Sequence, residues 1–179
     1  MSIESHQTSD RDGRWPLPEL ELRPVGPDDR DRVASMFDRM SFESRLMRFH
    51  TPKPRLTSRE LAFLTDVDHF RHVAVAAVDR RDGSIVGTAR YVQEAGRPGV
   101  ADVAVEVIDE LQNRGIGTAL AAEVIERARE NGFRLLTAAT LWENRPARAL
   151  LRRLRFRART SRRGELELEL ALAPSPNTP

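Results

Sequence analysis

A glycine-containing turn at residues 112–118 carries the clearest chemical signal in this 179-residue chain. It reads Gln-Asn-Arg-Gly-Ile-Gly-Thr and joins an alternating, β-branched stretch at 100–108 to a long helical pattern. The first N–H groups of a helix lack partners within it, and the helix dipole adds partial positive charge, so such a turn can bind a phosphate. Gly115 and Gly117 allow close backbone approach, and Arg114 adds donors suited to phosphate oxygens. The alternative is a tight strand-to-helix turn that binds nothing.

The composition narrows the classes of protein and of site. The chain has no cysteine, which excludes disulfides and thiolate metal sites. His69 and His72 lie three residues apart without a third ligand and form a poor metal site, so no metal is expected. The net charge is +2, Lys53 is the only lysine, and no basic run is interleaved with aromatic residues. Nucleic acid is therefore not an expected partner.

The ends of the chain and its hydropathy bear on location and domain organisation. No apolar run approaches the length of a membrane span, so no membrane partner is expected. The polar first residues lack the apolar centre of a signal peptide, which predicts a cytoplasmic protein. One domain is expected over residues 19–172, between flexible tails at 1–18 and 173–179. The sequence leaves the oligomeric state open.

The elements that must position the turn follow from periodicity and from capping signals. Alternating or β-branched stretches predict seven strands, at 19–25, 72–79, 84–93, 100–108, 134–141, 156–161 and 165–172. Helices are expected after residues 27–29, at 41–49, after the capping box of Thr57 and Glu60, from the glycine turn to Gly132, and after Asn144. This order, β-α-α-α-β-β-β-α-β-α-β-β, indicates an α/β sandwich built on a mixed sheet.

At this point the motifs resemble a known family. A strand, Gln-x-x-Gly-x-Gly, a helix, a strand, Glu-Asn-x-x-Ala-x-x-Leu, a helix and then Phe156 are similar to the GNAT N-acetyltransferase superfamily. The resemblance covers residues 19–172 and is most specific over 100–156. It implies a GNAT-type α/β fold, with a mixed, mostly antiparallel twisted sheet flanked by helices. Residues 40–50 and the strand at 101–105 resemble segments of bacterial protein-lysine acetyltransferases.

The resemblance implies acetyl-CoA as the acetyl donor and assigns residues to its two ends. The backbone of Val105 and Val107 would pair with the pantetheine arm, like an added strand. Asn144 would touch the pantetheine from the neighbouring strand end. The pyrophosphate would be cradled by Gln112, Asn113, Arg114, Gly115, Ile116, Gly117 and Thr118.

The transfer chemistry needs a base, because an amine attacks a thioester only when it is neutral. Asp102 is the first candidate, since it stands where the lysine-modifying group carries Glu, and Glu106 on the same strand face is the second. For each of them, a solvated strand acid or an ion pair with an arginine is the alternative. The family often has a Tyr as acid to the thiolate, and Leu151 occupies that position. Arg155 replaces the glycine that the family has before the final Phe, which predicts a different turn there.

The predicted function is transfer of acetyl from acetyl-CoA to a primary amine by direct attack with general-base help. Protein lysine is the favoured acceptor, because of the segment at residues 40–50. A small-molecule amine, such as a polyamine or an aminoglycoside, is the alternative within the enzyme class. A non-catalytic acyl-CoA-binding regulatory module is the alternative outside it, which the missing Tyr and the Asp-for-Glu exchange leave open.

Overall fold

The computed structural model describes residues 19–162 and 164–173. The tails expected at 1–18 and 173–179 lie outside the described residues, apart from Ala173. The strands are β1 Leu20–Pro24, β2 His72–Asp79, β3 Ile85–Gln93, β4 Val100–Val107, β5 Leu135–Leu141, β6 Arg157–Arg162 and β7 Glu165–Ala171. The helices are α1 Arg30–Asp38, α2 Phe42–Phe49, α3 Ser58–Thr65, α4 Ile116–Glu130 and α5 Arg145–Arg153, with short 3-10 turns η2 Pro27–Asp29 and η3 Asp109–Leu111. The predicted strands are confirmed, each end lying within one residue of its expected position.

The strands form a seven-stranded sheet in the order β1-β2-β3-β4-β5-β7-β6. Neighbouring strands are antiparallel throughout, except that β4 and β5 are parallel. This parallel pair is short, because only the first three residues of each strand, from Val100 and from Leu135, are in register. Beyond them the two strands separate, and this split in a mixed, mostly antiparallel sheet is the feature that positions the site.

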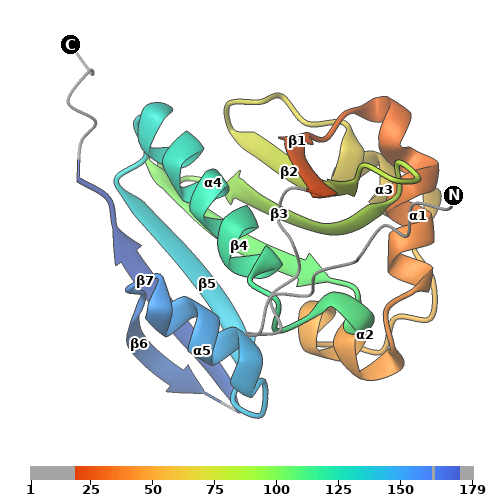
Figure 1. The fold of residues 1–179 in the computed structure, drawn as a ribbon. Helices are drawn as coiled ribbons and strands as arrows, with labels where there is room; N and C mark the ends of the chain where they lie inside the picture. Colours follow the sequence, from red (N-terminus) through yellow and green to blue (C-terminus); the bar gives the residue numbers. More distant parts are fainter. Residues whose placement is uncertain (1–18, 163, 174–179) are drawn as a thin grey trace, which may run out of the picture.

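Helices cover both faces of the sheet. Figure 1 shows α4 and α5 over the same face, and α4 packs on β2, β3 and β4. The apolar stripe predicted for α4 is confirmed: Ile116, Leu120, Val124 and Ala128 are all fully buried. The helices α1 to α3 gather beside the N-terminal strands, and α2 also reaches β4 and β5. Across the described residues, no helix combines the length and the apolar character needed to cross a membrane.

The last two helices end in the same way, which corrects one expectation. After α4, Gly132 takes a φ of 78°, and the following N–H reaches back to Ala128 at 2.9 Å. After α5, Arg155 takes a φ of 69°, and Phe156 donates to Leu151 at 2.9 Å. The prediction of a different turn at Arg155 is therefore wrong. The hydrogen bonds that end the helix hold an arginine in the left-handed conformation that glycine usually adopts.

Arg155→Gly is expected to stabilise the protein by about 0.5–1 kcal/mol, because relief of left-handed strain, about 1–2 kcal/mol, exceeds the entropy cost of glycine, about 0.5–1 kcal/mol. The melting temperature should rise by about 1–4 °C. Arg152→Gly is the matched control, since Arg152 lies within α5 and glycine there should lower the melting temperature. A melting temperature that is unchanged or lower for Arg155→Gly would contradict the strain argument.

Candidate active site

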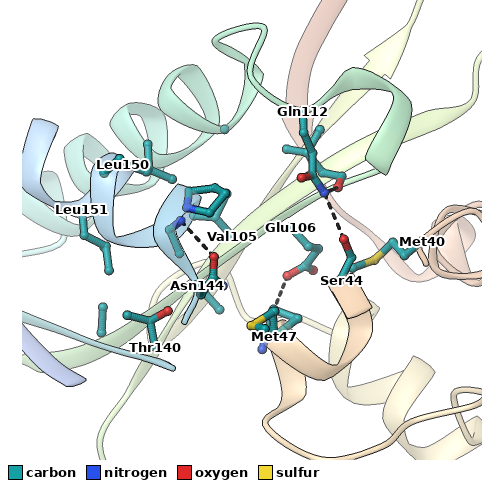
Figure 2. A pocket seen from close by; sticks show the side chains of 18 of the residues that line it. Met40, Ser44, Met47, Val105, Glu106, Gln112, Thr140, Asn144, Leu150 and Leu151 are labelled. Carbon is teal, nitrogen blue, oxygen red and sulfur yellow. Dashed lines mark hydrogen bonds and ion pairs between the residues drawn. The ribbon is translucent and has the colours of Figure 1, made fainter. Parts of the chain in front are cut away.

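A cleft of about 870 Å³ opens where β4 and β5 separate. Its walls come from these two strands, from the start of α4, from α5 and from α2 (Figure 2). Segments distant in the sequence thus meet at the split. The side chains that line it include those of Asp102, Glu106, Gln112, Asn144 and Leu151.

The backbone of β4 presents hydrogen-bonding groups to this split. The Gly99 carbonyl accepts from the first N–H of β5 at 3.2 Å, whereas the Val100 carbonyl accepts at 2.9 Å from the turn after β3. Since backbone groups alternate along a strand, the peptide groups of Val105 and Val107 face the split, beyond the last pairing with β5. An extended chain carrying amides can pair with them as an added strand does. The Val107 carbonyl already accepts from the Gln112 amide at 3.1 Å, and the pantetheine contact expected for both residues stays a prediction.

The glycine turn lies at the mouth of the cleft. Gly115 is the N-cap of α4 with φ 85°, and it supplies no side-chain hydrogen bond to the first turn of the helix. A Cβ added to Gly117 would lie 3.7 Å from each of Leu150, Val105 and Val107, and would fill space between α5 and β4. The turn therefore leaves room for a phosphate-bearing chain, which fits coenzyme A.

Of the seven residues expected to cradle the pyrophosphate, five line the cleft, and the cradle itself stays a prediction. Ile116 is 1% exposed and packs in the core, and Arg114 is not among the lining side chains. The five that line the cleft are Gln112, Asn113, Gly115, Gly117 and Thr118.

Gln112 and Asp109 hold helix α2 against the cleft. The Gln112 amide donates to the Val107 carbonyl at 3.1 Å and to the Ser44 hydroxyl at 3.2 Å (Figure 2). The Asp109 carboxylate accepts from the Ser41 N–H and hydroxyl and from the Ser44 hydroxyl, at 2.7–2.9 Å. This role of Asp109 was not predicted from the sequence. Ser41 as the N-cap of α2 was a local signal, but nothing local indicated its partner 68 residues away.

Asn144 caps α5, as its sequence predicts. Its side-chain oxygen accepts from the Ala147 N–H at 3.1 Å, and the residue lines the cleft beside Leu150 and Leu151 (Figure 2). The wall formed by α5 is apolar here, because it is lined by Leu150 and by Leu151, the position at which the resemblance implies a tyrosine. Tyr91 does not substitute for that tyrosine, since it is fully buried and its hydroxyl is held by Phe70 and Asn131.

Glu106 lies at the centre of a buried charge cluster. Arg48 donates to one carboxylate oxygen at 2.5 Å, the Thr88 hydroxyl donates to the other, and the Arg90 guanidinium lies 3.5 Å from that second oxygen. Burial alone would raise the pKa of Glu106, but the charges of Arg48 and Arg90 and these hydrogen bonds outweigh it and hold the pKa below its ordinary value. A carboxylate engaged in this way is a poor proton acceptor.

Asp102 lies four residues earlier on the same face of β4, in a different environment. Its carboxylate keeps contact with solvent, and the Thr137 hydroxyl is 3.4 Å from one oxygen. Desolvation by the surrounding protein raises the pKa of Asp102 above its ordinary value, although the charge of Arg48 and the Thr137 hydroxyl act in the opposite direction. A raised pKa brings a carboxylate closer to the range of an efficient base.

Among residues 19–162 and 164–173, no group of three or more side chains suited to a metal ion occurs.

A sheet split at its centre, with a strand backbone and an uncapped helix start facing the split, defines an acyl-coenzyme A-dependent transferase. The chain belongs to the acetyltransferase (GNAT) family, whose model matches residues 36–156. Members of this family use acetyl-CoA as their acetyl donor.

Two curated relatives carry the word acetyltransferase in their names. Acetyltransferase Pat of Mycolicibacterium smegmatis is 31% identical over 144 residues, which are 80% of this chain and 42% of the relative. Acetyltransferase PA5475 of Pseudomonas aeruginosa is 31% identical over 147 residues, which are 81% of this chain and 76% of the relative. The chain therefore spans less than half the length of the Pat relative.

Solved structures show the same fold. The GNAT domain of S. lividans PAT is 29% identical with a TM-score of 0.80, over 86% of this chain and 90% of that one. The structure of yncA from Salmonella typhimurium, which contains its cofactor acetyl-CoA, is 16% identical with a TM-score of 0.69, over 88% of this chain and 96% of that one.

Proposed function

We propose that this chain transfers the acetyl group of acetyl-CoA to the ε-amine of a protein lysine, with Asp102 as the general base. The observation that carries this proposal is the split between β4 and β5, which has a free strand edge along one side and Asp102 at its closed end. Of the two candidate bases, Asp102 has the accessible carboxylate and the raised pKa, whereas Glu106 is buried and paired with arginines.

The proposed mechanism assigns a role to each of these groups. A free lysine has a pKa of about 10.4 and is almost wholly protonated near neutral pH, so a group must accept its proton. Asp102 accepts it, directly or through a bridging water. The Val105 N–H donates to the oxyanion of the tetrahedral intermediate, and the thiolate of coenzyme A then leaves. The start of α4 holds the pyrophosphate.

A second cavity supports a cationic acceptor. It measures about 260 Å³ and shares Asp102, Ala138 and Ala139 with the main cleft. The acidic residues that line it are Glu94, Asp102, Glu167 and Glu169, against Arg97 and Arg159. Both arginines are paired, with Glu94 and Glu169 respectively, while Glu167 makes no ion pair with any described residue. The acidic charge left after these two pairs is that of Asp102 and Glu167, and it favours an amine that carries positive charge, such as a lysine side chain.

Glu167→Gln is expected to raise KM for a lysine-containing acceptor peptide by about two- to fivefold, the range of an exposed charge interaction. The KM for acetyl-CoA should stay unchanged, because Glu167 lines only the second cavity. Steady-state kinetics at low and high salt measure both constants, and the effect should shrink as salt rises. Glu21→Gln, an exposed glutamate on β1, is the matched control. An altered KM for acetyl-CoA, or no change at all, would contradict the assignment of the second cavity to the acceptor.

Binding and transfer are tested in sequence on the full chain. Calorimetric titration measures the affinity for acetyl-CoA, and thiol release with mass spectrometry then identifies the acetylated amines among a panel of proteins, polyamines and aminoglycosides. Acetylation of protein lysine supports the proposal. Acetylation of small amines alone would replace lysine as the acceptor, and binding without transfer to any amine would indicate a regulatory module. If acetyl-CoA does not bind even at millimolar concentration, the proposal fails.

A further inference from the structure

The side chain of Thr140 on β5 is buried in the wall of the cleft without a partner. The residue is 2% exposed, and its hydroxyl makes no hydrogen bond with any described residue. Figure 2 shows it beside Leu151, on the side of the cleft formed by β5 and α5. An unpartnered hydroxyl in a protein interior is unfavourable for folding, and such groups are uncommon in native proteins. The presence of threonine at this position therefore needs an explanation other than packing.

The register of the sheet places Thr140 opposite the proposed oxyanion donor. Asp102 pairs with Thr137, an offset of 35 positions between the two parallel strands. Continued across the split, the same offset sets Thr140 opposite Val105, the strand residue whose N–H faces the gap. Leu136, Ala138 and Thr140 are two residues apart along β5 and are all buried, so their side chains point to the same face of the strand.

The chemistry of the reaction requires stabilisation at this point. When the tetrahedral intermediate collapses, the carbon–sulfur bond breaks and its electron pair stays on the sulfur as a thiolate. Leu151 has no proton to donate, and Tyr91 is engaged elsewhere in the core. A hydroxyl on the opposite wall can donate a hydrogen bond to the developing charge without giving up its proton.

We propose that the Thr140 hydroxyl donates a hydrogen bond to the sulfur of coenzyme A and stabilises the departing thiolate. This inference rests on the proposed acetyl-CoA-dependent function. The amine proton goes to Asp102, the electron pair of the broken bond goes to sulfur, and the thiolate takes its proton from solvent after it leaves. Thr140 is then a catalytic residue in a cleft whose α5 wall offers leucine instead of tyrosine.

Thr140→Val tests the proposal, because it removes the hydroxyl and keeps the shape of the side chain. In the free protein the melting temperature is expected to rise by about 2–4 °C, since an unpartnered buried polar group has been removed. The value of kcat is expected to fall by about tenfold, equal to about 1.4 kcal/mol, with little change in the KM for acetyl-CoA. The pKa of the coenzyme A thiol in its complex with the protein, followed by the ultraviolet absorbance of the thiolate, is expected to rise.

Two further variants complete the design. Thr140→Ser keeps the hydroxyl and should retain most of the wild-type kcat and thiol pKa. Thr65→Val is the matched control, because the Thr65 hydroxyl is buried but donates to Leu61 at 2.8 Å, outside the cleft. It should lower the melting temperature and leave kcat unchanged.

The outcomes separate this inference from the proposed function. A Thr140→Val protein with unchanged kcat and unchanged thiol pKa, in an enzyme that still transfers acetyl groups, overturns the role of Thr140 alone. A lower melting temperature for Thr140→Val, with kcat unchanged, would show that the hydroxyl serves the folded structure. If the wild-type protein binds neither coenzyme A nor acetyl-CoA, the proposed function fails, and this inference with it.

Discussion

Asp102→Asn is expected to lower kcat by about 10²–10⁴-fold, the usual contribution of a positioned general base. The substitution keeps the size of the side chain and removes its ability to accept a proton. The affinity for acetyl-CoA should not change, because the contacts expected with acetyl-CoA come from the backbone of β4 and from the start of α4, which the substitution leaves in place. Rapid-mixing or steady-state assays of thiol release, with calorimetry for binding, measure the two quantities separately.

The pH profile provides a second test of Asp102. The base must be deprotonated to act, so the rate should rise with pH through the pKa of Asp102, which desolvation places above that of an ordinary aspartate. Asp102→Glu is the conservative control, since it keeps a carboxylate and should retain both activity and this acid limb. Wild-type turnover and an unchanged pH profile in Asp102→Asn would exclude Asp102 as the base.

Glu106→Gln is expected to act on stability, and the effect should be large. Glu106 is 7% exposed and lies between Arg48 and Arg90, the second of which is 2% exposed. Removing one member of a buried ion pair leaves the others uncompensated, at a cost of about 3–5 kcal/mol. The melting temperature should therefore fall by about 6–20 °C. Thermal and urea unfolding measure the loss, and activity per folded molecule should be retained at low temperature.

The stability contributed by Glu106 also depends on pH, with a definite sign. Its pKa in the folded protein is held below the ordinary value, so its contribution is fully present above the unfolded pKa and is lost as pH falls through the folded one. The difference in the free energy of unfolding between the wild type and Glu106→Gln should accordingly become smaller at acidic pH. Thr88→Val is the milder control, because it removes only the hydroxyl that donates to Glu106. It should lower the free energy of unfolding by about 1 kcal/mol. A Glu106→Gln protein with wild-type stability but no turnover would make Glu106 the base.

Much of the candidate site followed from local sequence signals. The alternation of β4 set the strand face that Asp102 and Glu106 share, and Gly115 marked the start of α4. The caps at Thr57 and Asn144 were also predictable, because each side chain bonds to an N–H three residues away. Interactions of this range depend on neighbouring residues alone, so they can be predicted from the sequence.

The difference between the two carboxylates was not predictable in the same way. Glu106 is paired because α2, 58 residues away, brings Arg48 to it, while Asp102 keeps access to solvent. A pKa depends on every charge and dipole within a few ångströms, and these come from several distant elements. Both acids were therefore candidates from the sequence, and only the folded arrangement shows that Glu106 is paired with arginines while Asp102 is exposed.

The sequence by itself determined the order of the elements, the mixed sheet, the glycine turn before α4 and the resemblance to GNAT acetyltransferases, since periodicity, caps and glycines act over a few residues. Only the tertiary structure decided that Arg155 adopts a glycine-like turn, that Asp109 holds α2 at the cleft, and that Thr140 is buried without a partner. Each of these depends on contacts or hydrogen bonds that exist only after the chain has folded, so the local sequence pattern does not predict them.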